Sequence, residues 1–540
     1  MTAAMDAGRR AVARIEAYVE AHPLAVDVAL VATITALGAV LRLALIGSIP
    51  YGVHADEAQI GMDARRIMDD WWIGPYTRAA LGEPTGHAYL ATPFVWLFGS
   101  TPIGLRFGFG LVGLTAVPLL YLLVRVALGR VEAVFASALL AVSYWHVFYS
   151  RVAHSSSTYP TVVLAVLLCL FLGMRSRNRW WFVAGGALFG LGVYAYNIYP
   201  IAVVAIGVFL ALITLREYRG EAWAGWWRSI AIFAVVAFIV ALPMIVYLAD
   251  PDAYYWDHFR NYQEVGVRDS PEYKDADFFG KVGLLAGQAK FFASAYAWEA
   301  RADVVDGNGG FRPMFDPPVL LLLLAGLPFA YVYRRRPLII AALCCLVIIP
   351  LPAVLQRGAI MREPLGAAPF AMLFAALPLA AAWRAARERG DAGRYLLMAA
   401  TLALVALIGT LTVRDYFWRA RQDPLVREIY FSEMTTASEY LRRLSTPAVV
   451  YFYSERAPLG LESRVYLAPD VEGEDRSREY SDRDASIEGI DRSRPAVFLL
   501  MGAYLELLPE IEARYPGGTE RISTRDGKTE FFAYELPPSP

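Results

Sequence analysis

Long apolar runs alternate with short polar connections along most of this sequence. A helix that crosses the hydrocarbon core of a bilayer needs about 20 apolar residues, and most of these runs approach that length. About eleven transmembrane helices are predicted, at 26–47, 102–124, 131–149, 159–174, 180–198, 200–215, 229–249, 318–333, 338–354, 365–383 and 395–413. We therefore predict a polytopic α-helical membrane protein whose transmembrane domain occupies residues 1–413.

Every second connection between these segments is basic, which predicts their orientation. The basic connections are the N-terminal arm, Arg125 with Arg130, 175–179, 216–228, 334–336 and 384–394. Short loops rich in arginine stay on the cytoplasmic side of a membrane. The pattern therefore predicts a multi-pass protein of the plasma (inner) membrane with a cytoplasmic N-terminus. Two long loops, 48–101 and 250–317, and the tail from residue 414 are then extracytoplasmic.

The tail, residues 414–540, has the pattern of a soluble domain. A helix at 437–444 precedes an apolar run at 448–453, and a second apolar run at 496–500 precedes a helix at 504–515. A last strand is predicted at 530–534, and the charged stretch 470–491 is interpreted as a loop. Strands that alternate with helices predict a small extracytoplasmic α/β domain. A docking or acceptor-binding role is the expectation for it.

The two outer loops also contain predicted helices. In the first loop, Ile60, Ala64, Ile67 and Trp71 fall on one face of a helix, and in the second the segment 278–298 is rich in aromatic residues. Both segments are expected to lie in the membrane interface, where amphipathic helices place their apolar face among the lipids.

Composition supports the membrane assignment and excludes some functions. Hydrophobic residues make up 57% of the chain, and the charged residues, 19%, are bunched between the apolar runs. A formal net charge of -1 without a basic face predicts no nucleic-acid partner. The three cysteines lie within apolar blocks, so no disulfide framework or zinc motif is indicated.

The adjacent carboxylates Asp56 and Glu57, just beyond the first span, are the main chemical feature of the sequence. One interpretation is structural, with Asp56 as the N-cap of the following helix and Gln59 completing a capping box. The other is catalytic, with a carboxylate at the membrane surface acting as a general base toward a hydroxyl group. The two roles are compatible, and the spacing alone does not choose between them.

The order of features along residues 26–415 resembles a known class of enzymes. The features are Asp56-Glu57 at the start of a long first outer loop, the stretch 98–107 that opens the second span, Tyr149-Ser-Arg151, and the aromatic run 190–200. Together they are similar to the C-type (GT-C) glycosyltransferases, and more narrowly to glycosyltransferase family 39. That family includes the protein O-mannosyltransferases and the bacterial aminoarabinose transferase of lipid A. A GT-C-like fold with an α/β tail is thus expected.

The resemblance implies an inverting transfer of a sugar from a polyprenyl-phosphate carrier to an acceptor hydroxyl at the outer face. Asp56 would be the general base, and Glu57 would orient it or hold the acceptor or a metal. The acceptor is left open between a lipid, a glycan and a protein. This chain lacks the lectin-like insertion of the eukaryotic protein mannosyltransferases, which puts a protein acceptor in doubt.

Arginines at the outer ends of spans are candidates to hold the donor phosphate, because a guanidinium group donates two parallel hydrogen bonds to it. In order of preference they are Arg151, Arg106, Arg362 and Arg357. Arg362 ranks below Arg151 because the tyrosine that often follows this arginine in the family is missing here. The alternative is that each arginine reaches the lipid headgroups.

Further residues are candidate ligands for the carrier, the sugar or a metal ion. Tyr194, Tyr196 and Tyr199 would line the carrier groove or stack on the sugar, although interfacial aromatic residues follow the same pattern. Some proteins that this chain resembles use a divalent metal such as Mg, Mn or Zn near the acidic motif. His54, Glu83 and His87 are the candidate ligands, without a fixed metal-binding spacing.

Two other classes of function are weighed against this one. A transporter or lipid-carrier flippase would also have many spans, but it is expected to show inverted repeats and ionisable groups at mid-membrane, and neither is evident here. A non-catalytic assembly protein would act mainly through its tail. The polar chemistry of the first outer loop favours an enzyme.

Overall fold

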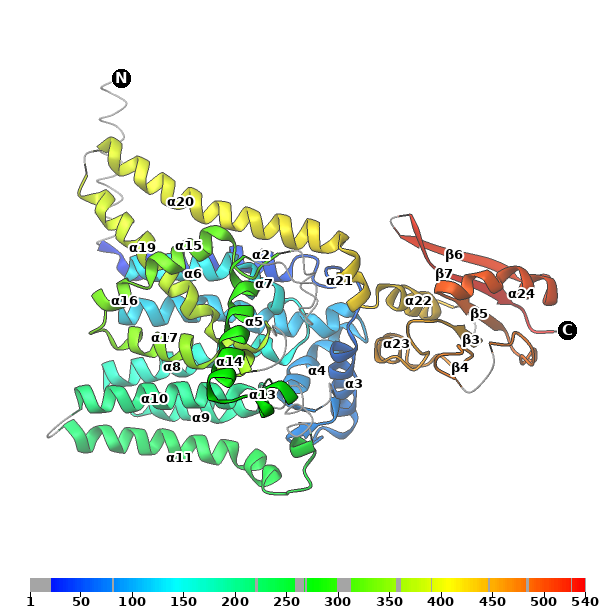
Figure 1. Ribbon diagram of the computed structural model, residues 1–540, viewed down its shortest axis with the longest axis horizontal. Coiled ribbons are helices and arrows are strands. Elements are labelled where there is room, and N and C mark those ends of the chain that lie inside the picture. The colour runs from blue at the N-terminus through cyan, green and yellow to red at the C-terminus, as the bar shows by residue number, and fades with distance from the viewer. Residues whose placement is uncertain are drawn as a thin grey trace.

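The computed structural model describes residues 21–79, 82–218, 222–257, 267, 270–298, 312–355, 361–389, 391–444, 447–481, 485–525 and 527–539. Arg357 lies outside these residues, so its predicted role stays a prediction. Within them, a bundle of long helices makes up the larger part of the molecule, and the tail forms a small mixed sheet beyond one end of the bundle (Figure 1).

Eight of the described helices are long and apolar enough to cross a membrane. They are α2 (Pro23–Leu43), α5 (Pro102–Ala127), η2 with α8 (Ser155–Thr158 and Tyr159–Ser176), α10 (Tyr199–Glu217), α11 (Ala222–Leu248), α17 with α18 (Pro337–Ile348 and Leu351–Leu355), η5 with α19 (Glu363–Ala367 and Ala368–Arg387), and α20 with the π-helical η6 (Asp391–Val413 and Arg414–Ala420). Several of them have a proline in the first turn, where its missing N–H has no helical partner anyway.

The three other predicted spans are shorter or bent. The pair α6 (Arg130–Val142) and α7 (Tyr144–Ser150) bends by 57°. Shorter apolar helices occupy the other two predicted segments, namely α9 with η3 (Trp180–Leu191 and Gly192–Tyr194) and α15 with α16 (Pro317–Gly326 and Phe329–Val332). Each of the eleven predicted segments therefore corresponds to an apolar helix or helix pair among the described residues.

Small residues let the helices of the bundle approach closely. A Cβ atom on Gly186 of α9 would lie 2.4 Å from the carbonyl oxygen of Phe233 on α11. A Cβ atom on Gly326 of α15 would overlap the carbonyl oxygen of Phe374 on α19. Such contacts replace the hydrophobic driving force that helices lack inside a bilayer.

The first of the two long loops folds against the rest of the protein. It contains α3 (Ala55–Asp70), the two-residue strands β1 (Tyr76–Thr77) and β2 (Glu83–Pro84), and α4 (Gly86–Phe98). The buried face of α3 packs on α4 and on α23 of the tail, and a Cβ atom at Gly61 would lie 2.4 Å from the ring of Tyr466. Ile60, Ala64 and Ile67 of the predicted apolar stripe are thus covered by protein, and the interfacial position of this helix stays a prediction. Trp71, by contrast, is 78% exposed.

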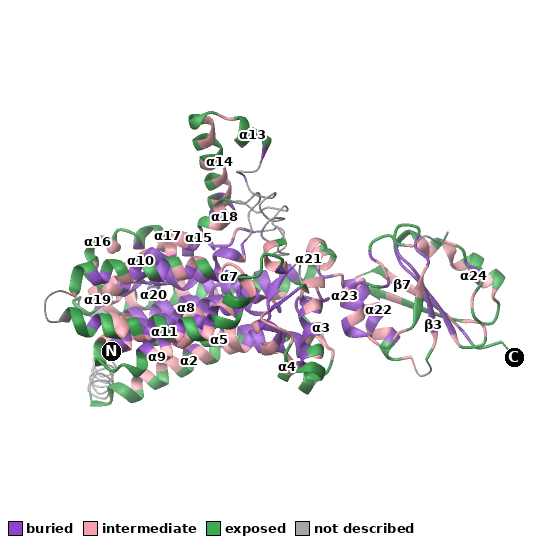
Figure 2. Cartoon of the chain, turned by 90° about the horizontal axis from the view of Figure 1, so that it is seen from below, coloured by how far each residue is buried: buried purple, intermediate pink, exposed green. Residues whose placement is uncertain are grey.

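The second outer loop projects from the bundle. Its described part contains α13 (Pro271–Asp275) and α14 (Phe278–Ala297). In both views α14 runs across the direction of the long helices, and in Figure 2 it stands out from the body of the molecule. Phe278 and Phe279 at its start are largely exposed.

The tail forms a five-stranded sheet in the order β4-β3-β5-β7-β6. Its elements are α21 (Pro424–Ile429), α22 (Ser432–Arg442), β3 (Val449–Tyr453), α23 (Glu462–Leu467), β4 (Gly473–Asp475), β5 (Ala496–Leu500), η7 (Gly502–Leu507), α24 (Leu508–Arg514), β6 (Thr519–Arg525) and β7 (Lys528–Leu536). Strand β3 is parallel to β4 and β5, whereas β7 is antiparallel to β5 and β6.

The α/β character of the tail is thus confirmed, with one correction. The stretch 470–491 is not only a loop, because Gly473–Asp475 pairs with β3 as an edge strand. The other edge strand, β6, carries mostly exposed polar residues and so lacks the apolar pattern of a strand. An edge strand with one solvated face needs no continuous apolar run.

Candidate active site

The N-terminus of α3 presents the two adjacent carboxylates to different surroundings. His54 is the N-cap, and its Nδ1 accepts the backbone N–H of Asp56 at 3.1 Å. Glu57 completes the capping box, accepting the backbone N–H of His54 at 3.1 Å. The prediction that Asp56 and Gln59 form this cap is therefore wrong, and Gln59 instead donates to Glu462 of the tail at 2.8 Å. Because His54 caps the helix, the carboxylate of Asp56 stays available and about a third exposed (32%).

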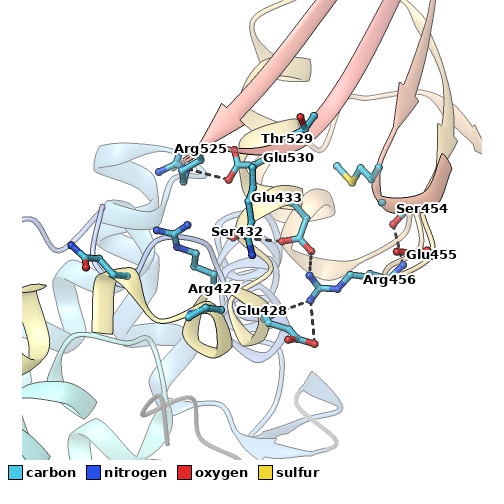
Figure 3. A pocket seen from close by; sticks show the side chains of 15 residues that line it. Arg427, Glu428, Ser432, Glu433, Ser454, Glu455, Arg456, Arg525, Thr529 and Glu530 are labelled. Atoms are coloured by element: carbon cyan, nitrogen blue, oxygen red, sulfur yellow. Dashed lines mark hydrogen bonds and ion pairs between the residues drawn. The ribbon is translucent and has the colours of Figure 1, made fainter. Parts of the chain in front are cut away.

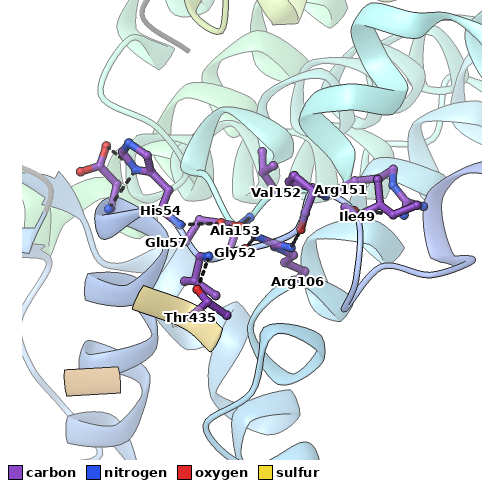
Figure 4. Close-up of polar contacts among 12 residues, drawn as sticks. Ile49, Gly52, His54, Glu57, Arg106, Arg151, Val152, Ala153 and Thr435 are labelled. Atoms are coloured by element: carbon purple, nitrogen blue, oxygen red, sulfur yellow. Dashed lines mark hydrogen bonds and ion pairs between the residues drawn. The ribbon is translucent and has the colours of Figure 1, made fainter. Parts of the chain in front are cut away.

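Glu57 is buried and accepts four hydrogen bonds (Figure 4). Its Oε1 accepts Arg106 Nε–H at 2.8 Å and the Ala153 backbone N–H at 2.8 Å. Its Oε2 accepts Arg106 Nη2–H at 2.6 Å and the backbone N–H of His54. Glu57 thus connects the first outer loop, the start of the second span and the turn after α7. Both of its oxygens are engaged within the protein, whereas the carboxylate of its neighbour Asp56 is partly exposed.

Arg106, predicted to bind phosphate, is fully buried and holds the first loop instead. Besides the carboxylate of Glu57, its guanidinium donates to the carbonyl oxygens of Pro50 at 2.8 Å and Gly52 at 2.6 Å. To bind a substrate phosphate, the guanidinium of Arg106 would have to give up these hydrogen bonds. The prediction of phosphate binding does not fit this placement, in which Arg106 holds the residues before α3 and Glu57 together.

Arg151, the preferred phosphate ligand from the sequence, is also fully buried. Its guanidinium donates to the carbonyl oxygens of Leu41 at 2.9 Å and Ile49 at 3.2 Å (Figure 4). It lies over the rings of Tyr416 and Phe417, with 4.9 and 4.8 Å between its Cζ and the ring centroids. Such contacts anchor the end of the first span to the last one.

A small pocket of about 40 Å³ opens beside Asp56. It is lined by His54, Asp56, Glu57, Tyr149, Val152, His154, Arg362, Ile429 and Tyr430. These residues come from the first loop, from both sides of the Arg151 turn, from the turn before α19 and from the tail. Of the candidate phosphate ligands, Arg362 is the one among the described residues that line this pocket. Arg151 and Arg106, which ranked above it in the sequence, do not line the pocket of Asp56.

The tail closes one side of this region. The backbone N–H of Val53 donates to Thr435 Oγ1 at 3.1 Å, and the hydroxyls of Tyr51 and Thr436 lie 2.8 Å apart. Tyr430, which precedes α22, places its ring 5.7 Å from the guanidinium carbon of Arg106. The residues that precede Asp56 are therefore held between the bundle and the start of the tail.

The three predicted tyrosines occupy different positions. Tyr196 is buried with its ring 6.0 Å from that of His154, and it lies next to the pocket. Tyr194 donates its hydroxyl to the carbonyl oxygen of Val240 at 3.0 Å, and Tyr199 is fully buried beside Tyr159. Of these three tyrosines, all among the described residues, Tyr196 is the one that borders the candidate site.

The predicted metal ligands are not brought together as one set. Glu83 Oε2 and His87 Nε2 lie 3.3 Å apart in the buried part of the first loop, and His154 Nε2 lies 3.8 Å from Glu83 Oε1. His54, in contrast, faces Asp56, with 3.7 Å between Nδ1 and Oδ2. In the part of the chain that the structure describes, no three His, Cys, Asp or Glu side chains are grouped so as to hold a metal ion. The side chains present therefore do not fit the predicted metal site.

Burial explains the state of this cluster. Burial and the nearby charge of Asp56 raise the pKa of Glu83 to about 8, against the opposing effects of Arg362 and of the hydrogen bond from Ser155. Burial lowers the pKa of His87 to about 3. At neutral pH a protonated carboxyl group therefore lies beside a neutral imidazole, and the cluster adds no charge next to Asp56.

His154 belongs to this site although the sequence pattern did not identify it. It lines the pocket, its Nδ1 accepts the backbone N–H of Ser156 at 3.0 Å, and burial lowers its pKa well below the usual value, with a further effect from Arg362. Its position three residues after Arg151, in the same outer turn, is the signal that could have identified it.

Comparison with known proteins supports the class of fold. Residues 82–247 match the family model described as "dolichyl-phosphate-mannose-protein mannosyltransferase". Together with the likeness to solved structures, this match confirms the resemblance to the GT-C glycosyltransferases at the level of fold. The chain is a multi-pass membrane protein of that architecture.

Two crystal structures of ArnT from Cupriavidus metallidurans resemble the whole chain. The form bound to undecaprenyl phosphate has 14% sequence identity and a TM-score of 0.54, over 95% of this chain and 97% of that one. The apo form has 13% identity and a TM-score of 0.54, over 96% and 98%. The archaeal oligosaccharyltransferase AglB from Archaeoglobus fulgidus has 13% identity and a TM-score of 0.49, over 94% of this chain and 74% of that one.

Proposed function

We propose that this protein is an inverting glycosyltransferase that moves a sugar from a polyprenyl-phosphate carrier to an acceptor hydroxyl, with Asp56 as the general base. The observation that carries the proposal is the pocket in which Asp56, a partly exposed carboxylate, lies with Arg362 at the end of the bundle next to the tail. The binding of undecaprenyl phosphate by ArnT, which has the same fold, supports the class of donor.

The chemistry requires little beyond these groups. The acceptor oxygen attacks the anomeric carbon while the bond from that carbon to the phosphate oxygen breaks, and the bonding electrons leave with the phosphate. Asp56 takes the proton of the acceptor hydroxyl. The lipid phosphate is stable as an anion, so no general acid is needed. Attack opposite to the leaving group inverts the configuration of the sugar.

Arg362 is the residue that we assign to the departing phosphate. Its side chain lines the pocket, and its charge lowers the pKa of Glu83 and of His154, as expected for a guanidinium aimed at this cluster. A charge that is already in place where negative charge develops stabilises the transition state without reorganisation. Glu57 and Arg106 act through Asp56, because their ion pair determines where α3 begins.

The volume of the pocket sets a condition on the mechanism. The pocket, of about 40 Å³, is well below the range of about 300–1,000 Å³ that is usual for small-molecule sites. Ile429 and Tyr430 form the side of the pocket that belongs to the tail. In the proposed mechanism donor binding therefore requires the pocket to widen, whereas the carboxylate of Asp56 is already about a third exposed.

The test is sugar transfer in membranes that contain the wild-type protein, the Asp56→Asn variant or the Asp70→Asn variant. Asp70 lies at the exposed end of the same helix, so it controls for the loss of one carboxylate from α3. A panel of radiolabelled undecaprenyl- and dolichyl-phosphate sugars serves as donors. We expect Asp56→Asn to abolish transfer and Asp70→Asn to retain it. Equal transfer by all three proteins would refute the role of Asp56.

A further inference from the structure

A second, larger cavity of about 650 Å³ lies between the sheet of the tail and the helices that connect it to the bundle (Figure 3). Its size falls within the range of about 300–1,000 Å³ that is usual for small-molecule sites. One wall consists of residues from α21 and from the start of α22. The opposite wall consists of loops at the end of the sheet and of the hairpin that joins β6 to β7.

The topology of the sheet places this cavity where α/β folds bind ligands. After β3 the chain passes to β4 on one side of it, whereas after β5 it passes through α24 to β6 and then to β7, which pairs with β5 on the other side. The two parallel strands therefore flank the point at which the strand order reverses. In open α/β sheets the crevice at this point, beyond the carboxyl ends of the strands, is the usual ligand site.

The residues that directly follow both strands line the cavity. Ser454 and Glu455 follow β3, and Met501 and Gly502 follow β5. Gly502 has a φ of +60°, and a Cβ atom there would lie 2.6 Å from Oε1 of Glu455. A glycine at this position therefore leaves room for the Glu455 side chain at the rim of the cavity.

The lining of the cavity is polar and balanced in charge. Four of its residues are basic and four are acidic, with Pro424 and Met501 as the main apolar members. Arg456 pairs with Glu433 at 2.9 Å and with Glu428 at 3.7 Å (Figure 3). An ion would meet charges of its own sign as often as opposite ones, and an apolar ligand would leave these groups without water. A neutral ligand with many hydroxyl groups can donate to the carboxylates and accept from the cations at once.

We infer that this cavity binds a neutral saccharide, the part of the acceptor that does not react. The inference rests on the proposed function, because it makes the acceptor a glycan or glycolipid. The two sites adjoin along one short segment: Arg427 and Glu428 line the cavity, while Ile429 and Tyr430 line the pocket of Asp56. A saccharide that is held in the cavity can therefore extend past this segment toward the base.

The direct test measures saccharide binding without any donor. Saturation-transfer NMR on the full-length protein in detergent, with neutral disaccharides of mannose, glucose and galactose as probes, is compared among the wild type, Thr529→Trp and Thr519→Trp. Thr529 lines the cavity, whereas Thr519 is an exposed residue of the neighbouring strand away from it. Lys528→Met is a milder variant that removes one hydrogen-bond donor from the lining.

We expect at least one disaccharide to bind the wild type and Thr519→Trp alike, with affinity lowered about tenfold or more in Thr529→Trp and less in Lys528→Met. Binding that is equal in all four proteins, or no binding of any probe to the wild type, would overturn the inference. The assay uses no polyprenyl donor, so saccharide binding without sugar transfer would refute the proposed function and leave this site standing.

Discussion

Replacement of Glu57 by glutamine tests whether the two adjacent carboxylates have separate roles. The change keeps the size of the side chain and removes its charge. Each oxygen of Glu57 accepts two hydrogen bonds, so whichever oxygen becomes the amide nitrogen faces two donors. At least one of these donors belongs to Arg106, which has no access to water.

The cost can be worked out from these contacts. Two buried donors left without an acceptor cost about 1–3 kcal/mol each. The guanidinium of Arg106 also becomes a buried charge without a partner, and removal of one member of a buried ion pair costs about 3–5 kcal/mol. The second figure already includes the unpaired donors, so the two are not added, and we expect the free energy of unfolding to fall by about 3–5 kcal/mol. Asp56→Asn changes a side chain that is about a third exposed and should stay within about 0.5 kcal/mol of the wild type.

The assay is denaturant unfolding of the purified variants in one detergent, followed by sugar transfer at a temperature where both remain folded. Glu57→Gln should unfold at a lower denaturant concentration, and Asp56→Asn should unfold with the wild type but lose transfer. An Arg106→Met, Glu57→Leu double variant should recover part of the lost stability, because it removes both charges. Wild-type stability of Glu57→Gln would refute the role assigned to the buried ion pair.

Three other changes have definite expected outcomes. Arg362→Ala should lower kcat/KM for the polyprenyl-phosphate sugar by about 10²–10³-fold, as for loss of one transition-state donor, with unfolding unchanged; a change below about threefold would contradict its role at the phosphate. The raised pKa of Glu83, about 8, means that the native state holds a proton that the unfolded state has released, so the free energy of unfolding should fall as pH rises from about 4.5 to 8. Glu83→Gln should remove this dependence when unfolding is measured across that pH range. An unchanged slope of unfolding free energy against pH in the variant would contradict the prediction. Helix α14 and the segment before it contain three of the four lysines of the chain, and Phe279 at the start of α14 is largely exposed. A nitroxide at Phe279 in nanodiscs should therefore be more accessible to oxygen than to a water-soluble nickel complex, and this difference in accessibility should grow with anionic lipids. Greater accessibility to the nickel complex would place α14 in water.

The membrane architecture followed from the sequence because its cause is local. A span must be apolar over its whole length and must satisfy its backbone groups internally, so each span can be recognised by itself. The same reasoning located β3 and β5 of the tail, which are buried on both faces. It failed for β6, whose polar residues give no signal of a strand until β7 pairs with it.

The candidate site could be predicted only in part. The position of Asp56 after the first span marked the right loop, because order along the chain fixes which end of a span a residue is near. The helix cap was assigned to the wrong residue, since histidine is an uncommon N-cap and its role depends on where the chain turns before α3. The convergence of His154 with Asp56 needed contacts between segments about a hundred residues apart.

By itself the sequence determined that the chain crosses a membrane many times, that its tail is an α/β domain, and that Asp56 and several arginines lie at span ends. Only the tertiary structure decided which of these arginines meets Asp56. A span end gives the depth of a side chain in the membrane, whereas its direction depends on how each helix is rotated against its neighbours. That rotation buries Arg106 against Glu57 and Arg151 against the aromatic residues of the last span, and it leaves Arg362 lining the pocket.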